Sequence, residues 1–236
     1  MQQDQVHVEA TDLAPSPTAS DNASAELDRL HAQIRVCERC GLHATRTQAV
    51  PGTGPLNAEI MIVGEAPGFT EDVQGQPFVG QAGKLLDTLL QQIGLSRQQV
   101  FITNVLKCRP PQNRDPMPNE ADACLPYLRQ QFALVRPKAV LILGRHALER
   151  MLPGVGSISR VHGQIFMRSG VAFMPCYHPA AALHNGSLLA DLQKDFDRVR
   201  EYLDRLLSKP AAAEEPQQEE AANGEPEPEP EQLPLI

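Results

Sequence analysis

Four cysteines of this 236-residue chain have a spacing that suits a metal centre. Cys37 and Cys40 form a CxxC pair, and Cys108 and Cys124 have fifteen residues between them in NVLKCRPPQNRDPMPNEADAC. Four thiolates fit zinc or an iron–sulfur centre, and the wide second spacing favours the latter, because zinc ribbons usually close with a second short pair. The alternative is a redox pair or partial metal site with two packing cysteines. The fifth, Cys176, is expected to be a small buried apolar residue.

Apolar, β-rich runs indicate the elements that would position such a centre. Residues 59–64, 100–105, 138–144 and 171–177 are predicted to be buried strands. Amphipathic helical patterns lie between these runs and after the last one. Strands that alternate with helices predict an α/β fold, a three-layer α/β/α sandwich with a mostly parallel four-stranded central sheet.

Polar motifs follow the ends of three of these strands. GEAPG follows the first strand, Asn104 ends the second and HPA follows the fourth. Sheets of this kind bind ligands beyond the carboxyl ends of their strands. The motifs therefore locate a site without identifying its chemistry, because many unrelated α/β enzymes share this arrangement.

The two ends of the chain differ in composition from its middle. Residues 1–22 contain four acidic residues and no Lys or Arg, and residues 210–236 contain eight Glu and no Lys or Arg. The middle has 17 acidic and 21 basic residues, so its formal charge is +4 although the whole chain carries -8. We expect a disordered acidic tail over 1–22, one folded domain over 23–208, and a disordered Glu/Pro-rich tail over 209–236. The basic middle permits a polyanionic partner.

The sequence shows no membrane span or signal peptide. No apolar run approaches about eighteen residues, and the N-terminus MQQDQVHVEATD lacks basic and apolar regions. We expect a cytoplasmic protein without a membrane partner. In that compartment cysteines are metal ligands, catalytic groups or core residues more often than disulfides.

Four separate blocks of the sequence match one known pattern. CERC, GEAPGFTEDVQGQPFVGQAGKLLD, TNVLKCRPPQNRDPMPNEADAC and CYHPAAAL, in this order and spacing, resemble the family 4 uracil-DNA glycosylases, the iron–sulfur branch of that superfamily. The resemblance covers about residues 27–206. It implies a bacterial DNA repair enzyme that flips uracil out of single- or double-stranded DNA and hydrolyses its N-glycosidic bond, leaving an abasic site. It also implies one [4Fe-4S] cluster bound by Cys37, Cys40, Cys108 and Cys124.

The resemblance assigns roles that the chemistry explains. Cleavage develops positive charge on the sugar and negative charge on the base. Glu65 would activate the attacking water and favour the sugar cation, and His178 would donate to uracil O2. Phe78 would stack on the flipped base, and Gly64 would let the backbone approach the ligand closely. Asn104 would donate to uracil O4 and accept from N3–H, which rejects cytosine.

Contacts with the DNA are predicted from the basic middle of the chain and from the family pattern. Lys107, Arg109 and Arg114 are candidates for phosphate contacts. Leu183 would enter the duplex where the base has left, and His184 would contact a phosphate. The segment AALHNGSLL that contains both departs from the family pattern, in which Arg and Pro are frequent.

The last five residues, QLPLI, differ from the acidic tail before them. They resemble the Gln-Leu-x-Leu-Phe peptide that bacterial replication and repair proteins insert into the sliding clamp. We expect a monomer that binds a bacterial clamp through Gln232, Leu233, Leu235 and Ile236, tethered by a flexible spacer. The alternative is a chance apolar terminus.

Other members of the superfamily fit less well. Family 5 enzymes generally lack an acidic residue where this chain has Glu65. The branch that becomes covalently linked to DNA carries an Arg-rich insertion ending in His, which the Cys108 loop lacks. A non-catalytic or redox-sensing iron–sulfur DNA-binding protein is the alternative from another class, and the joint presence of Glu65, Phe78, Asn104 and His178 argues against it.

Overall fold

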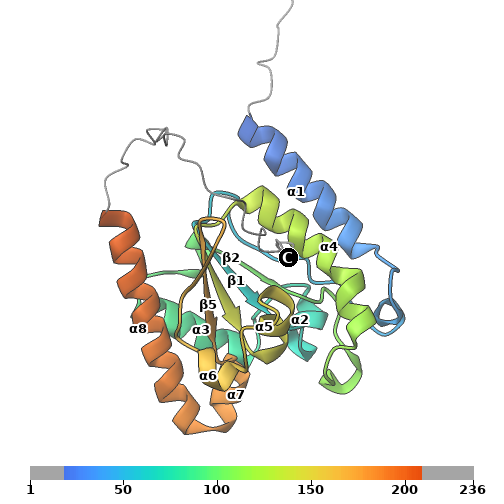
Figure 1. Ribbon diagram of the computed structural model, residues 1–236. Coiled ribbons are helices and arrows are strands. Elements are labelled where there is room, and N and C mark those ends of the chain that lie inside the picture. The colour runs from blue at the N-terminus through green and yellow to red at the C-terminus, as the bar shows by residue number, and fades with distance from the viewer. Residues whose placement is uncertain (1–18, 209–236) are drawn as a thin grey trace, which may run out of the picture.

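The computed structural model describes residues 19–208. Its central sheet has five strands in the order β2-β1-β3-β5-β4 (Figure 1). The strands are β1 (Ile60–Gly64), β2 (Val100–Asn104), β3 (Ala139–Leu143), β4 (Phe166–Arg168) and β5 (Val171–Cys176). The four predicted strands are confirmed and pair in parallel. The predicted total of four is wrong, because β4 adds an antiparallel edge strand. β4 has three residues and none is buried, so it lacks the apolar run that marks the others.

Helices connect and cover the strands. They are α1 (Ala19–Arg35), α2 (Phe69–Gln74), α3 (Gln81–Gln92), α4 (Pro118–Val135), α5 (Arg145–Met151), α6 (Ile158–Val161), α7 (Pro179–His184) and α8 (Gly186–Ser208). Helix α1 begins inside the range 1–22 that the sequence assigned to the N-terminal tail. The tail over 209–236, with its predicted clamp peptide, lies outside the described residues.

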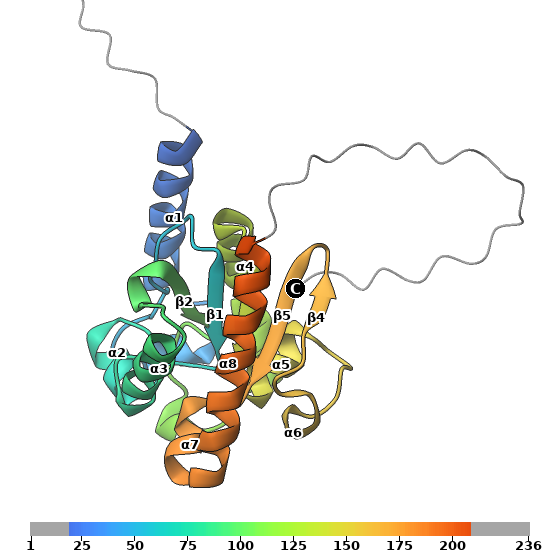
Figure 2. The same cartoon turned by 90° about the vertical axis from the view of Figure 1, so that its left-hand side faces the viewer.

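The sheet separates two hydrophobic cores. Met61 and Val63 of β1 pack with residues of α1, α4 and α5, whereas Ile60 and Ile62 pack with residues of α3 and α8. In Figure 2, α8 lies in front of the sheet, and α4 and α5 lie behind it. Every residue of β1 is buried, as a parallel strand covered on both faces requires. The predicted three-layer α/β/α class is therefore confirmed.

The parallel strands all end at the same edge of the sheet. Gly64 at the end of β1 is in register with Asn104 at the end of β2, and Leu143 of β3 is in register with Cys176 of β5. The segments that follow these ends therefore meet there. They are the GEAPG loop, the loop from Cys108 to α4, the start of α5, and the segment that enters α7.

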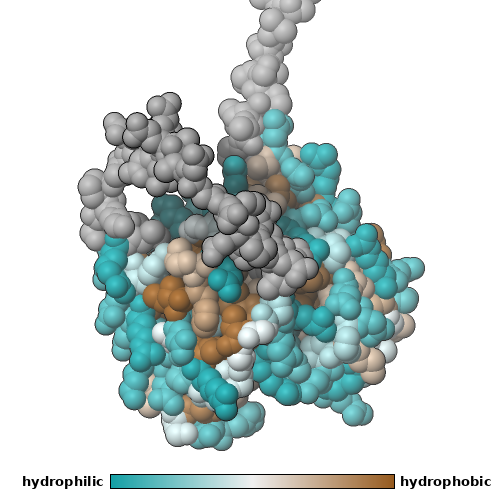
Figure 3. Space-filling view, viewed as in Figure 1, coloured by the Kyte–Doolittle hydropathy of each residue, from teal (hydrophilic) through white to brown (hydrophobic). Residues whose placement is uncertain are grey.

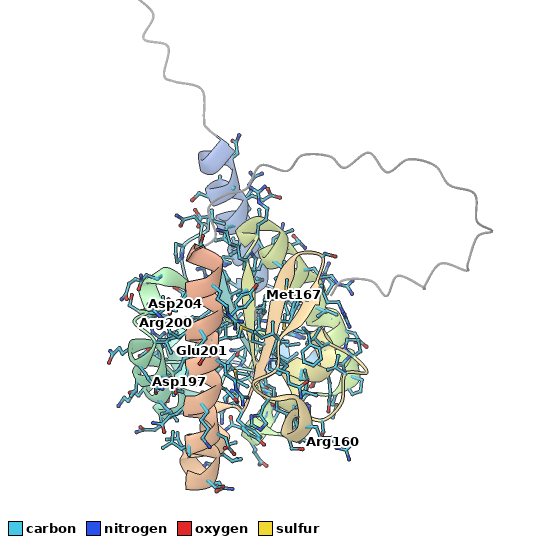
Figure 4. The ribbon with its side chains drawn as sticks, turned by 60° about the vertical axis from the view of Figure 1, so that its left-hand side comes forward. Arg160, Met167, Asp197, Arg200, Glu201 and Asp204 are labelled. Carbon is cyan, nitrogen blue, oxygen red and sulfur yellow. The ribbon has the colours of Figure 1, made fainter. Side chains whose placement is uncertain are left out.

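The outer surface is mainly polar. Asp197, Arg200, Glu201 and Asp204 lie along the exposed face of α8 (Figure 4), where Arg200 and Asp204 form an ion pair at 2.9 Å. Figure 3 shows hydrophilic residues over most of one face, with apolar residues gathered beside α8. Met167 of the edge strand β4 is half exposed. None of the described helices has the length and apolar character needed to cross a membrane.

Candidate active site

A pocket of about 560 Å³ opens at the carboxyl ends of the parallel strands. The predicted catalytic and base-binding residues Glu65, Phe78, Asn104 and His178 line it. They belong to the loop after β1, the loop before α3, the end of β2 and the N-terminal cap of α7. The fold thus brings together side chains that lie up to 113 positions apart in the sequence.

Asn104 lines this pocket, and Gly64 lies against its side chain. A β-carbon on Gly64 would lie 2.4 Å from Asn104 Oδ1 and 2.6 Å from the Phe78 ring, so only glycine leaves room. Asn104 is buried, and its Oδ1 has no hydrogen-bond partner among the described residues. A buried acceptor without a partner costs free energy that a ligand donor would recover. The pocket therefore presents an acceptor to a ligand N–H group.

The Phe78 ring forms one wall of the pocket. It stacks on the His178 imidazole, with ring centroids 5.6 Å apart and an angle of 26° between the planes. The backbone of Phe78 is left-handed, with φ 52°, which is uncommon for a residue other than glycine. The Arg97 guanidinium donates to the carbonyl oxygens of Phe78 and, at 3.1 Å, of Pro77. It also pairs with Asp87 at 3.0 Å. Arg97 therefore holds Phe78 in this conformation.

Glu71 supports the same loop from within the pocket. Its side chain is buried, and its Oε1 accepts from the backbone N–H groups of Val79 at 2.9 Å and Gly80 at 2.7 Å. The sequence analysis gave no role to Glu71 or Arg97. Glu71 lies three residues after GEAPG, and this proximity to the motif could have marked it as a candidate site residue. Nothing near Arg97 in the sequence marks it, because it reaches the loop from a separate 3₁₀ turn (Arg97–Gln99).

His178 caps helix α7 and faces the pocket. Its Nδ1 accepts from the backbone N–H of Ala180 at 3.1 Å, so the proton of the neutral ring lies on Nε2. Burial lowers the pKa of His178 to about 4, and the charge of Glu71 offsets this only in part. At neutral pH the ring is therefore an uncharged donor with one available N–H.

Glu65 supplies the carboxylate of the pocket. Its backbone is fixed by a hydrogen bond from the Leu106 N–H to the Glu65 carbonyl at 2.9 Å. Burial raises the pKa of the Glu65 carboxyl, whereas the charge of the nearby His146 lowers it. The net direction is upward, which places the carboxyl closer to the range of a general base than a surface glutamate.

The four predicted ligand cysteines meet in a second, small cavity that also borders Lys107 and Tyr127. N–H groups donate to three of their sulfurs: Arg39 N to Cys37 Sγ at 3.5 Å, Lys107 N to Cys124 Sγ at 3.4 Å, and Arg46 Nη1 to Cys108 Sγ at 3.1 Å. None of the described cysteines is in a disulfide. Cys176 is fully buried in the core that contains α3 and α8, as predicted.

The chemistry of these side chains suits a metal centre, because thiolates are the ligands that zinc and iron–sulfur centres use. Burial raises the pKa of the Cys108 thiol and raises that of Cys124 to about 11, so metal binding would have to displace both protons.

The predicted DNA contact by Lys107 is wrong. The side chain is 1% exposed and turns inward from the end of β2. Its Nζ donates to Thr103 Oγ1 at 2.6 Å, to Gln131 Oε1 at 2.7 Å and to the Asn104 carbonyl at 2.7 Å. Burial lowers the pKa of Lys107 to about 7. Lys107 therefore supports the backbone of Asn104 and cannot reach a phosphate.

The other predicted DNA contacts lie near the pocket. Arg114 lines it and pairs with Glu120 at 2.6 Å. Arg109 lies with its guanidinium 5.2 Å from the ring centroid of Phe69, which is exposed. Leu183 is half exposed on α7, and His184 at the end of that helix is exposed. Their positions are compatible with DNA contact, which stays a prediction.

Comparisons with known proteins agree with this geometry. The sequence profile described as "Uracil DNA glycosylase superfamily" matches residues 51–206. A type-4 uracil-DNA glycosylase of Sulfurisphaera tokodaii is 47% identical over 74% of this chain and 84% of its own length. One of Saccharolobus solfataricus is 46% identical over 78% of this chain and 88% of its own length. A type-5 uracil-DNA glycosylase of Pyrobaculum aerophilum is 34% identical over 56% of this chain and 65% of its own length.

Proposed function

The chain belongs to the uracil-DNA glycosylase superfamily and to its type-4 branch, and we propose that it hydrolyses the bond between uracil and deoxyribose in DNA. The C1′–N1 bond breaks with its electron pair on uracil N1, and water forms the new C1′–O bond. The products are uracil and an abasic site, which starts base excision repair. The type-4 relatives favour an enzyme over the non-catalytic alternative.

The unpaired Asn104 Oδ1 is the observation that carries this proposal. In the pocket it accepts from uracil N3–H, while the amide nitrogen donates to uracil O4. Cytosine presents an N4 donor and an N3 acceptor, the reverse pattern. Each mismatched polar group in a buried site costs about 1–3 kcal/mol, which is enough to reject cytosine.

Glu65 and His178 act on opposite partners of the breaking bond. His178 Nε2–H donates to uracil O2 as negative charge builds there, and the neutral ring is supported by its N-cap hydrogen bond to Ala180. Glu65 takes a proton from the attacking water and stabilises the cationic sugar. Phe78 stacks on the base once it has left the helix.

Cys37, Cys40, Cys108 and Cys124 are proposed to hold a [4Fe-4S] cluster. The meeting of four thiols at one small cavity and the N–H groups that donate to three of the sulfurs support a metal–thiolate centre. The wide spacing of Cys108 and Cys124 favours a cluster over one zinc ion. A cluster bound there would join the segment after α1, the loop after β2 and helix α4. It would supply a fixed framework for the loop from Cys108 to α4.

The DNA would lie across the mouth of the pocket. Arg109 and Arg114 are proposed to contact phosphates, as is His184. Leu183 is proposed to fill the space that the flipped base leaves. We place this activity in the cytoplasm, at the nucleoid, and expect a monomer.

Single-turnover release of uracil from a U:G duplex tests the proposed function. Asn104→Ala and His178→Ala should each slow release at least tenfold, about 1.4 kcal/mol of barrier. Asn57→Ala, an exposed amide outside the pocket, should match the parent. No release by folded parent protein with its iron bound would refute the assignment and leave an iron–sulfur DNA-binding protein.

The C-terminal peptide is proposed to recruit the enzyme to a bacterial sliding clamp through Gln232, Leu233, Leu235 and Ile236. A tethered apolar peptide turns a weak contact into useful recruitment. Deletion of 232–236 should abolish clamp binding in a pull-down and leave uracil release unchanged. Equal clamp binding by the full chain and by the chain without 232–236 would contradict this proposal.

A further inference from the structure

A group of ionisable side chains lies beside Glu65 and is not used by the proposed reaction. One carboxylate oxygen from each of Glu65 and Asp115 and one ring nitrogen of His146 all lie within 4.8 Å of one another. The three residues come from the loop after β1, the loop between β2 and α4, and the first turn of α5. The arrangement therefore depends on three segments that meet only in the folded protein.

Asp115 holds this group together. Its Oδ2 accepts from Arg145 Nη2 at 2.5 Å, and its Oδ1 lies 3.2 Å from His146 Nε2. His146 Nδ1 lies 3.6 Å from a carboxylate oxygen of Glu149 on the same helix. The imidazole thus sits between two exposed carboxylates, while the ring itself is only 17% exposed.

The Nε2 atom of His146 is available to a third partner. It is buried, and its contact with Asp115 is close in distance but is not a well-aligned hydrogen bond. A buried ring nitrogen without an aligned partner is costly unless a charge nearby stabilises it. Glu65 is the other carboxylate in reach.

We propose that His146, held by Asp115, is a positioning residue for Glu65 that fixes the charge and direction of this carboxylate in the pocket. The proposal rests on the proposed function, in which Glu65 acts on water. Two carboxylates at this distance repel each other, and one would take up a proton unless a cation lies beside them. Arg145 pairs with Asp115, and a positive charge on His146 lowers the pKa of Glu65. His146 does not line the pocket, so it would act on Glu65 without contacting the substrate.

The neighbouring cations and anions shift the pKa of Glu65 in opposite directions, so their variants should have opposite effects. After burial, which raises the pKa of Glu65 most, His146 and Arg145 lower it, and Asp115 and Glu149 raise it. Uracil release that needs the Glu65 carboxylate falls as pH drops through this pKa. His146→Gln removes a cation, so the acid limb should move to higher pH. Asp115→Asn removes an anion, so the limb should move to lower pH.

The experiment measures single-turnover uracil release from a short single-stranded oligonucleotide between pH 5 and 9, with EDTA present. We expect the acid limb of His146→Gln to lie at least half a pH unit above that of the parent, and that of Asp115→Asn to lie below it. Asp122→Asn is the matched control. It breaks an ion pair with Arg150 of α5, the helix that carries His146, and the Asp122 side chain is as exposed as that of Asp115, at 64%. Its profile should coincide with that of the parent.

Glu149→Gln gives an independent variant if the His146 change disturbs folding, because Glu149 is 64% exposed. Its acid limb should move in the same direction as that of Asp115→Asn. Acid limbs that coincide with the parent in these variants, or an equal loss of rate at every pH, would overturn the proposal. No release by the parent at any pH would refute the proposed function instead.

Discussion

Gly64 and Asn104 stand side by side at the ends of β1 and β2, and the Phe78 ring closes the space above them. A methyl group at Gly64 would not fit in this space. The sequence indicated close backbone approach at Gly64, but the partners of that approach come from the register of two strands. The ligand that fits here therefore depends both on the side chains present and on the pairing of β1 with β2.

Gly64→Ala should slow uracil release at least tenfold. The added methyl group would meet Asn104 Oδ1 at 2.4 Å and displace the amide or the Phe78 ring. Single-turnover kinetics would measure the loss, and circular dichroism would check the fold. Gly41→Ala is the control, because a β-carbon there meets nothing within 4 Å. Parent-like kinetics in Gly64→Ala would show that the pocket has more room than this contact implies.

The sequence placed Glu65, Asn104 and His178 at one edge of the sheet because they follow the ends of parallel strands. It failed for Lys107, which was assigned to DNA because it is a basic residue of the basic middle of the chain. Adjacency in the sequence does not reveal the direction of a side chain. Lys107 turns inward because Thr103, Gln131 and the Asn104 carbonyl together satisfy its ammonium group.

Among the elements, the loop from Cys108 to α4 contributes Pro110, Asn113 and Arg114 to the pocket. Arg114 pairs with Glu120 at the start of α4, and Asp115 pairs with Arg145 of α5. Pro-rich sequence predicted a loop here, but the pairs that order it lie on other elements. The sequence analysis missed the edge strand β4, because its three residues form no apolar run. Its only local signal was the turn residues Ser169 and Gly170, which both have a left-handed backbone.

The loop that contains Phe78 depends on Arg97 from another element. Arg97→Met should raise KM for a uracil-containing oligonucleotide several-fold and change kcat less, because stacking on Phe78 binds the base throughout the reaction. Steady-state kinetics give both constants. Asp87→Asn is the matched control, since it removes the ion pair of Arg97 and leaves its bonds to the two carbonyl oxygens. An unchanged KM in Arg97→Met would show that the loop holds its shape without the guanidinium.

Arg46 connects the segment after α1 to the cysteine centre. Its Nη1 donates to Cys108 Sγ and to the Cys37 carbonyl at 2.7 Å, and its Nη2 donates to the Arg35 carbonyl at 2.9 Å. Arg46→Leu should make the visible absorption of the proposed cluster decay several-fold faster in air and should make its reduction potential more negative. Arg160→Leu, on the exposed helix α6, is the control. Identical decay in both variants would count against this role.

At the scale of the whole molecule, two histidines are buried in neutral form. Burial lowers the pKa of His178 and of His31 on α1 to about 4, and Arg35 and Lys107 add to the effect at His31. The unfolded chain takes up these protons near the ordinary pKa of about 6.5. The contribution of these two histidines to folding stability should therefore rise with pH between about 4 and 6.5 and level off above.

His31→Gln should flatten this dependence. The variant removes one of the two groups that bind a proton in the unfolded chain but not in the folded one. Urea unfolding midpoints between pH 5 and 7.5 would measure the slope, with the exposed His43→Gln as the control. A slope equal to that of the parent would mean that His31 is not buried as a neutral ring.

The two cysteine pairs also have a consequence for synthesis of the protein. Cys40 leaves the ribosome 84 residues before Cys124, which at about 5–20 residues per second is a delay of roughly 4–17 s. Until Cys108 emerges, 68 residues after Cys40, the nascent chain exposes a two-thiol chelate that can hold a metal but cannot complete the site. Iron delivery that succeeds only after α4 has emerged would therefore favour the correct centre, and early capture of zinc by Cys37 and Cys40 would compete with it.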